Sequence, residues 1–402
     1  MTSRRVLVVV SGGIAAYKTP ELVRALRKAG HEVRCVLTRA AAEFVSPLAL
    51  QTVSGQRVRS ALFDPAEEGE IDHVALADWA EAVVVAPATA DLLARMAHGL
   101  ADDLASTLLL ATRAELLVAP AMNVNMWRHP ATQDNVATLR ARGVRFVGPD
   151  AGFLACGWEG EGRMSEPAEI AGAVELALGP RSLAGEHVLV TAGGTREAID
   201  PVRAITTHSS GKMGFAIAAE AARRGATVVL VAGPSAHPTP PGVRRVDVES
   251  ALQMRDAVLA ELERATVVIK AAAVADFRPA APSERKIKKE SLGEGQGLAL
   301  ELVRNPDILA EVGRRKGRRI VVGFAAESED LVAAARRKLE RKGCDLVVAN
   351  DVSRPGAGFD GDTNAVVLVW PGGQVEELPL LSKAEVAAQL LDRLEKLRGE
   401  RA

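Results

Sequence analysis

One pattern occurs twice in this chain and limits its fold more than any other: an apolar run that ends in a pair of glycines. Residues 6–13 read Val-Leu-Val-Val-Val-Ser-Gly-Gly, and residues 188–194 read Val-Leu-Val-Thr-Ala-Gly-Gly. Such a run predicts a buried strand that enters a tight turn before a helix. Because 402 residues also exceed one comfortable hydrophobic core, we expect two domains in tandem, over residues 1–180 and 183–402.

Both halves alternate short apolar runs with segments of helical length. The strands expected in the first half are Arg5–Val10, Glu32–Leu37, Ala82–Ala86, Glu115–Ala119 and Val144–Val147, with helices over Pro20–Ala29 and Asp91–Leu110. Those expected in the second half are His187–Thr191, Thr227–Val231, Thr266–Lys270, Arg319–Phe324 and Asp345–Ala349, followed by a hairpin of Asn364–Trp370 and Gln374–Leu378. Continuous rather than alternating apolar runs indicate parallel sheets covered on both faces. The fold class is therefore α/β, with two doubly wound, mainly parallel Rossmann-like sheets; the first is flavodoxin-like, and the second ends in a hairpin.

Composition narrows the functional classes. Fifty basic residues balance 51 acidic ones, which argues against a nucleic-acid partner. No apolar stretch reaches the length of a membrane span. Three cysteines are too few and too scattered for a disulfide framework or a zinc site. We expect a cytoplasmic protein.

The turns of the first half carry the first set of motifs. Ser11-Gly12-Gly13-Ile14-Ala15-Ala16-Tyr17-Lys18 opens a helix, a disposition that suits a phosphate but also fits a simple tight turn. Ala86-Pro87-Ala88-Thr89-Ala90-Asp91 and Pro120-Ala121-Met122-Asn123-Val124-Asn125-Met126-Trp127 each follow a predicted strand. Residues 154–164 are rich in glycine, contain Ala155-Cys156-Gly157, and are expected to lack regular structure. Asp72-His73-Val74 precedes a helical segment.

Together these motifs resemble those of the flavin-dependent cysteine decarboxylase family over the whole first half. The resemblance implies bound FMN, which oxidises the substrate thiol so that the neighbouring carbon can accept electrons when CO₂ leaves. It implies that His73 is a base or proton relay, that Asn123 holds the substrate carboxylate, and that Cys156 protonates the product. The flavin positions that it implies are Ser11, Gly12, Gly13, Thr38, Ala88, Thr89 and Asp91. The family often has Asn at the position of Asp91, which leaves the flavin contact of Asp91 in question.

A second set of motifs follows in the other half. Ser209-Ser210-Gly211-Lys212-Met213-Gly214 precedes an Ala-rich helix but lacks the glycine spacing and the Ser or Thr of a Walker A motif. Further motifs are Lys270-Ala271-Ala272-Ala273-Val274-Ala275-Asp276-Phe277, Lys286-Ile287-Lys288-Lys289, Asn305-Pro306-Asp307-Ile308 and Gly323-Phe324. Lys338 and Lys342 share one face of a predicted helix, which is also common on a solvated surface.

This set resembles phosphopantothenate–cysteine ligase, and the fused halves resemble the bifunctional decarboxylase–ligase family. The resemblance implies CTP as co-substrate and Mg²⁺, with 4′-phosphopantothenate activated as an acyl-cytidylate and cysteine as the amine. The positions implied to bind nucleotide are Lys270, Ala271, Ala272, Asp276, Lys286, Asn305, Pro306, Asp307, Ile308, Phe324, Lys338 and Lys342, with Lys286 as the catalytic cation. The resemblance does not indicate which residues bind the Mg²⁺ ion. Thr207 stands where the family usually has an Asn that contacts the intermediate; its hydroxyl has a single donor, and we expect ligation to survive, with His208 or Ser209 contributing.

Two other interpretations stay open. Relatives of the flavin decarboxylases can serve as non-catalytic regulatory subunits, although His73, Asn123 and Cys156 are all present. A nicotinamide or flavin oxidoreductase would need G-x-G-x-x-G with an acidic residue about 20 positions on, which neither half has. The family resemblance also implies a homo-oligomer, built from trimers of the first domain and dimers of the second.

Overall fold

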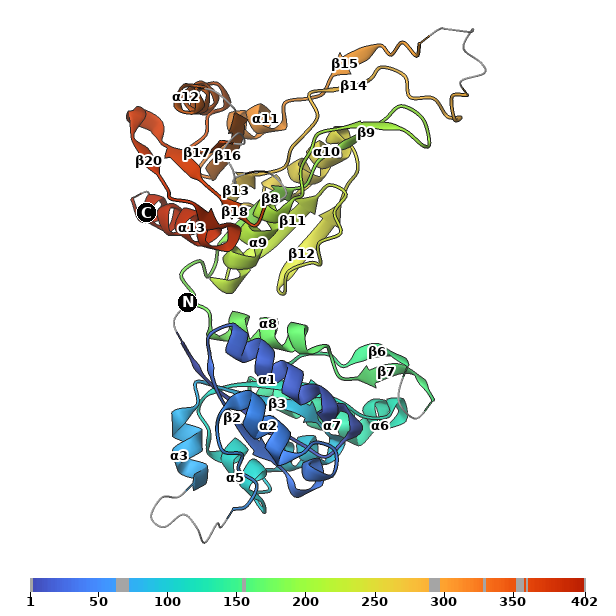
Figure 1. Cartoon of the computed structure of the whole chain (residues 1–402), viewed down its shortest axis with the longest axis vertical. Coiled ribbons are helices and arrows are strands. Elements are labelled where there is room, and N and C mark those ends of the chain that lie inside the picture. Colours follow the sequence, from blue (N-terminus) through green and yellow to red (C-terminus); the bar gives the residue numbers. More distant parts are fainter. Residues whose placement is uncertain are drawn as a thin grey trace. The chain divides into compact units, whose positions relative to one another are not determined.

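The computed structural model describes residues 3–62, 72–153, 157–288, 297–327, 330–351, 358 and 361–400. The chain divides into two compact units, Met1–Gly179 and Pro180–Ala402. Each unit contains a mainly parallel sheet with helices on both faces (Figure 1). This architecture confirms the predicted fold class.

The sheet of the first unit has five parallel strands in the order β2-β1-β3-β4-β5, which is the flavodoxin-like order. The strands are β1 (Arg5–Val10), β2 (Glu32–Leu37), β3 (Ala82–Ala88), β4 (Glu115–Pro120) and β5 (Arg145–Phe146). In register, Val8 of β1 lies between Cys35 of β2 and Val84 of β3. In this topology ligands bind beyond the carboxyl ends of the strands, near the switch between β1 and β3.

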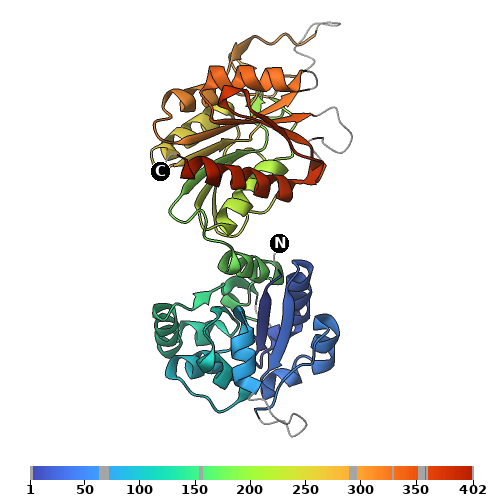
Figure 2. The same ribbon diagram turned by 90° about the vertical axis from the view of Figure 1, so that its left-hand side faces the viewer.

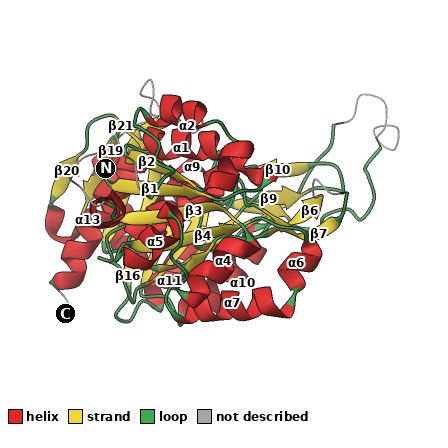
Figure 3. Ribbon diagram, turned by 90° about the horizontal axis from the view of Figure 1, so that it is seen from below, coloured by secondary structure: helices red, strands yellow, loops and turns green. Residues whose placement is uncertain are grey.

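Helices cover both faces of this sheet (Figure 3). On one face, Leu22 of α1 and Ile170 of α8 share a core cluster with Val8 of β1. On the other face, Leu93 of α4 and Leu108 of α5 share a second cluster with Val9. The helical elements are η1 (Ile14–Lys18), α1 (Thr19–Lys28), η2 (Arg39–Glu43), α2 (Pro47–Ser54), α3 (Asp72–Trp79), α4 (Ala90–His98), α5 (Leu104–Ala111), α6 (Val124–Arg128), α7 (Pro130–Ala141) and α8 (Pro167–Leu178).

Two local predictions for this unit are wrong. The helix expected over Asp91–Leu110 is divided into α4 and α5, because Gly99 ends α4 in the left-handed conformation (φ 68°) and Asp103 starts α5 with a capping box. The glycine-rich stretch, expected to be irregular, contributes β7 (Glu159–Arg163), which pairs antiparallel with β6 (Asp150–Phe153).

The main sheet of the second unit has the order β12-β11-β8-β13-β16-β17-β19-β20. Its first six strands are parallel and follow the Rossmann order 3-2-1-4-5-6, so the topological switch lies between β8 and β13. Their bounds are β8 (His187–Ala192), β11 (Thr227–Ala232), β12 (Val243–Asp247), β13 (Val267–Lys270), β16 (Ile320–Glu327) and β17 (Leu346–Asp351). The antiparallel strands β19 (Val366–Val369) and β20 (Val375–Glu377), joined by η4 (Pro371–Gly373), confirm the predicted hairpin, whereas β12 was not predicted.

Helices α10 (Ala251–Leu262), α11 (Ile308–Arg314) and α12 (Leu331–Lys342) share a core cluster on one face of this sheet. Helix α9 (Lys212–Arg223) contacts β8, β11 and the long helix α13 (Lys383–Gly399), which is dark red in Figure 2. Three small antiparallel pairs complete the unit: β9 (Arg196–Ala198) with β10 (Ala204–Thr206), β14 (Phe277–Pro279) with β15 (Leu302–Arg304), and β18 (Thr363–Asn364) with β21 (Leu381–Ser382).

Candidate active sites

The first candidate site lies at the carboxyl edge of the first sheet, where the turns after β1 and β3 meet. Ser11 Oγ joins these turns, because it donates a hydrogen bond to the Pro87 carbonyl (2.8 Å) and accepts one from the Thr89 amide (3.0 Å). A Cβ at Gly12 would stand 2.3 Å from the Cβ of Ala40, so the turn has room only for glycine. The result is an exposed backbone turn that leads into η1 and α1, a geometry suited to an anion.

Beside this turn lies a cavity of about 680 Å³, within the range of small-molecule sites. The predicted flavin and catalytic residues that line it are Gly12, Gly13, Thr89 and Asn123. Much of the remaining wall is apolar and consists of Ile14, Ala15, Ala90, Ala121, Met122, Met126, Phe153 and Met164. A polar turn beside an apolar wall fits a phosphate joined to a flat aromatic ring.

Asn123 is held at the cavity wall by its position as the N-cap of α6. Its side-chain Oδ1 accepts a hydrogen bond from the Asn125 amide at 2.8 Å. The neighbouring Met122 amide donates to the Gly162 carbonyl of β7, which joins the α6 turn to the β6–β7 hairpin. The Pro-Ala-Met-Asn motif thus places an amide side chain on a fixed backbone.

A charged cluster on the same cavity was not predicted. Glu166, the N-cap of α8, accepts a hydrogen bond from Lys18 Nζ at 2.9 Å and another from Arg163. The Lys18 and Arg163 side chains hold the pKa of the Glu166 carboxyl below its usual value. Lys18 and Arg163 belong to motifs that the sequence had singled out, but nothing in the sequence pairs them with Glu166.

Other predicted flavin residues do not line this cavity. Thr38 caps η2, with its hydroxyl oxygen accepting from the Ala41 amide at 3.2 Å, and Ala88 is buried at the end of β3. The Asp91 side chain is 73% exposed and its carboxylate lies 3.0 Å from Arg95 Nε. Within the described part of the unit, Asp91 therefore faces solvent rather than the cavity.

The structure describes two of the three predicted catalytic residues of this unit, His73 and Asn123. His73 lies half-buried on α3 and is not part of the cavity lining, whereas Asn123 is. Cys156 lies outside the described residues. Their joint action stays a prediction.

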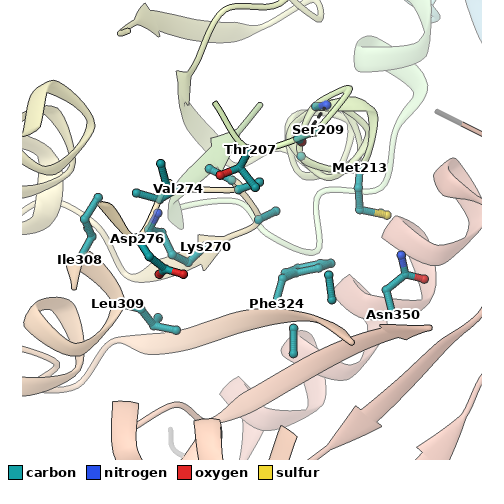
Figure 4. A pocket seen from close by; sticks show the side chains of 18 of the residues that line it. Thr207, Ser209, Met213, Lys270, Val274, Asp276, Ile308, Leu309, Phe324 and Asn350 are labelled. Atoms are coloured by element: carbon teal, nitrogen blue, oxygen red, sulfur yellow. Dashed lines mark hydrogen bonds between the residues drawn. The ribbon is translucent and has the colours of Figure 1, made fainter. Parts of the chain in front are cut away.

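The second candidate site is a cavity of about 720 Å³ at the switch point between β8 and β13. Figure 4 shows Thr207, Lys270, Asp276, Ile308 and Phe324 around it, carried by separate elements. The predicted residues that line it are Thr207, Lys270, Ala271, Ala272, Asp276, Asn305, Pro306, Asp307, Ile308, Phe324, Lys338 and Lys342. The hexapeptide Ser209–Gly214 lines it as well, whereas Lys286 is exposed and does not.

Two buried threonines fix the loop after β13. The hydroxyl oxygen of Thr191 accepts from the Ala272 amide (3.1 Å), and that of Thr195 accepts from the Ala275 amide (3.0 Å). Asn305 then holds the other side of the loop, because its Nδ2 donates to the Ala275 carbonyl at 2.8 Å. The alanine-rich turn is therefore fixed by side chains from β8, from the turn that follows β8 and from the loop before α11.

Three of the lysines predicted to bind nucleotide line the cavity, from α12 and β13, and Lys212 of α9 and Lys383 of α13 line it as well. Lys338 Nζ donates to the Phe324 carbonyl at 2.5 Å, and Lys342 forms an ion pair with Asp307. Burial opposes ionisation of Asp307, but the hydrogen bonds from Lys342 and from the Ala310 amide, together with the charges of Lys342 and Lys338, lower the pKa of that carboxyl. The third lysine, Lys270, is 7% exposed and ends β13.

Lys286 belongs to a loop that is tied to the rest of the unit. Its neighbour Ile287 donates its amide to Asp200 Oδ2 at 3.1 Å, and Asp200 also accepts from the amides of Val202 and Arg203 at 2.8 Å each. Burial alone would raise the pKa of Asp200, but these amides and the Arg203 side chain lower it. An ionised Asp200 thus anchors the loop that carries Lys286.

Several residues of the second cavity were missed. Asn364 and Lys383 line it from the C-terminal segment, where no motif marks them. Asn350 also lines it, at the carboxyl end of β17. It belongs to the motif Ala349-Asn350-Asp351-Val352, which follows a predicted strand, but it was not among the predicted binding residues.

Among residues 3–62, 72–153, 157–288, 297–327, 330–351 and 361–400, no group of three or more His, Cys, Asp or Glu side chains is placed to hold a metal ion. In the same part of the chain, no helix has both the length and the apolar character needed to cross a bilayer.

Comparison with known proteins gives matches for both units. Residues 1–178 match the family model described as Flavoprotein, and residues 183–397 match that described as the DNA/pantothenate metabolism flavoprotein C-terminal domain. The chain is 49% identical to the Coenzyme A biosynthesis bifunctional protein CoaBC of Vibrio vulnificus (strain YJ016), covering 99% of both proteins. It is 50% identical to the CoaBC of Escherichia coli (strain K12), covering 98% of this chain and 97% of that protein. The CoaBC of Bacillus subtilis (strain 168) is 44% identical, with 100% of both covered.

Proposed function

The chain belongs to the family of coenzyme A biosynthesis bifunctional proteins, and from this premise we propose that its two cavities catalyse successive steps. The second unit ligates 4′-phosphopantothenate to L-cysteine with CTP. The first unit then decarboxylates the phosphopantothenoylcysteine product to 4′-phosphopantetheine with FMN. The convergence of the nucleotide motifs, from Thr207 to Lys342, on one cavity at the switch point carries this proposal.

The residues of the first cavity fit FMN. The glycine turn at Gly12 and Gly13 suits the phosphate, and the apolar wall that includes Met122 and Phe153 suits the ring. When bound, FMN supplies a two-electron oxidation of the substrate thiol and later returns the electrons. The Asn123 amide orients the substrate carboxylate from the N-cap of α6. We further propose that His73 and Cys156 move the protons of this reaction.

The second cavity provides positive charge for a triphosphate. Lys338 and Lys342 lie on one face of α12 and line the cavity. We further propose that Lys286, which does not line the cavity in this structure, supplies an additional cation to the bound nucleotide. Cationic groups stabilise the charge that grows on pyrophosphate as it leaves. Mg²⁺ in nucleotide sites is commonly bound by substrate phosphates with one or two carboxylates, and we propose that the phosphates of CTP hold it here.

We also propose that the enzyme is a cytoplasmic homo-oligomer. Large apolar side chains around the first cavity are exposed, among them Ile14 (58%), Tyr17 (62%), Met126 (49%) and Phe153 (73%). Exposed apolar groups beside a site commonly mark a surface that another chain covers. Light scattering on the purified protein tests this, and a monomer at micromolar concentration would contradict it.

The test of function supplies 4′-phosphopantothenate, cysteine and CTP, and follows CMP, pyrophosphate and CO₂ by mass. Wild type should make 4′-phosphopantetheine. Asn123→Ala should stop at phosphopantothenoylcysteine, and Lys338→Ala should lose CMP formation. Lys396→Ala, an exposed lysine on α13, is the matched control and should behave as wild type. Because ligation comes first, Lys338→Ala should release CO₂ only when phosphopantothenoylcysteine is supplied. Loss of CMP formation in Asn123→Ala, or no CO₂ from added phosphopantothenoylcysteine in Lys338→Ala, would contradict two separate sites.

A further inference from the structure

Lys270 has an environment unlike that of the other lysines in the nucleotide cavity. Its residue is 7% exposed, at the carboxyl end of β13, and it lines the cavity. The contact recorded for its Nζ is with Met254 Sδ of α10, at 3.7 Å. A thioether is a weak acceptor and carries no charge. Among the described residues, no carboxylate forms an ion pair with Lys270.

The charged groups that face Lys270 do not neutralise the positive charge of its ammonium group. Lys338 of α12 repels its charge, and Asp307, which attracts it, is already paired with Lys342. Burial and then Lys338 lower the pKa of Lys270 from 10.5 to about 7. The empty cavity therefore holds a buried amine that is largely neutral at slightly alkaline pH.

We propose that Lys270 is a phosphate-binding residue of the nucleotide site, and that its ammonium charge forms only when the anionic chain of the nucleotide enters. This inference rests on the proposed ligase function, which it deepens. The triphosphate supplies the ion-pairing negative charge beside Lys270 that no described carboxylate supplies. Lys270 then takes up a proton from solvent as the complex forms. The charge is thus confined to the bound state, where it contributes to affinity.

The direction of the pH dependence follows. At pH 8 about one tenth of Lys270 is protonated in the empty cavity. A nearby anion raises the pKa of a lysine by about 1–3 units, so binding should take up about 0.4–0.9 proton at this pH. Since the bound state holds more protons, the Kd should rise with pH, by about two- to eightfold between pH 8 and 9.

The experiment is isothermal titration calorimetry on the full-length protein at pH 8 with Mg²⁺. CTP, and separately inorganic tripolyphosphate, are titrated in buffers of different ionisation enthalpy, which gives the number of protons taken up. Lys270→Met removes the amine and keeps the length of the side chain beside Met254. Lys396→Met is the matched control, because that lysine is exposed on α13 and does not line the cavity. Lys270→Met should unfold at no lower temperature than wild type, since a buried amine is lost.

We expect wild type and Lys396→Met to take up the proton with both anions, and Lys270→Met to lack this uptake and its rise of Kd with pH. Equal uptake in wild type and Lys270→Met would overturn the proposal. So would uptake with CTP but not tripolyphosphate, or failure of both anions to bind wild type. Lys270-dependent uptake in a protein that forms no CMP would instead refute the ligase function and leave this assignment intact.

Discussion

Replacement of Gly214 by alanine tests how closely the nucleotide turn is packed. Gly214 lies in the first turn of α9, against the carboxyl end of β8. An added Cβ would stand 2.5 Å from the Cβ of Ala192 and 2.9 Å from the carbonyl oxygen of Thr191. Carbon atoms in contact prefer about 3.5–4.0 Å. Helix α9 must therefore move away from the strand by about 1 Å.

The size of the effect follows from two opposing terms. Alanine favours a helix over glycine by about 1 kcal/mol, whereas overpacking costs about 1–3 kcal/mol. The blocking atoms belong to a buried strand that cannot yield, so we expect the upper part of that range and a net loss of about 1–2 kcal/mol. For a domain of this size the melting temperature should fall by about 2–8 °C.

Differential scanning calorimetry measures this loss, and calorimetric titration with CTP measures the function. Because the hexapeptide Ser209–Gly214, which includes the first residues of α9, lines the cavity, CTP affinity should fall by about tenfold or more. Flavin content should stay unchanged. Gly399→Ala is the control, since an added Cβ there meets nothing within 4 Å. A Gly214→Ala protein with wild-type melting and wild-type CTP affinity would refute the reasoning.

Three further predictions concern single residues. Asp200→Asn should lower the rate of ligation by about ten- to hundredfold. The substitution removes the carboxylate oxygen that accepts from the Ile287 amide, and so releases the loop that carries the predicted catalytic lysine. An unchanged rate of CMP formation would contradict this. Burial raises the pKa of Cys35 to about 12 and that of Cys344 to about 11, so at pH 8 both thiols stay protonated. Iodoacetamide should therefore modify them only after unfolding, and rapid modification of the native protein, seen by mass spectrometry, would be inconsistent with their burial. Ligation should proceed with Thr207 in place, and a protein that makes the acyl-cytidylate but no amide would show that its hydroxyl is insufficient.

Most of the fold could be predicted because both sheets are covered on both faces. A strand buried in this way reads as a continuous apolar run, and Arg5–Val10 and Glu32–Leu37 were predicted to the residue. The division between α4 and α5 was missed because apolar spacing continues past Gly99, although a glycine and a capping residue marked the break. At this break, the helix-ending glycine and the capping aspartate indicate the structure better than the apolar periodicity does.

The candidate sites were predictable to different degrees. In the second unit the motif residues follow the strands of one sheet edge, and a Rossmann topology brings such positions together. Asn364 and Lys383 escaped prediction because the C-terminal segment reaches the cavity through tertiary packing that no local pattern records. In the first unit Asn123 lines the cavity, whereas His73 does not, and their joint role rests on the family resemblance.

The central claim is that one chain couples nucleotide-driven amide formation to flavin-dependent loss of the cysteine carboxylate. Cysteine labelled with ¹³C at its carboxylate, supplied with 4′-phosphopantothenate and CTP, tests this through the ratio of labelled CO₂ to CMP. We expect one labelled CO₂ for each CMP at completion, and none when CTP is omitted. Label retained in the final thiol product, or released without CTP, would contradict the account.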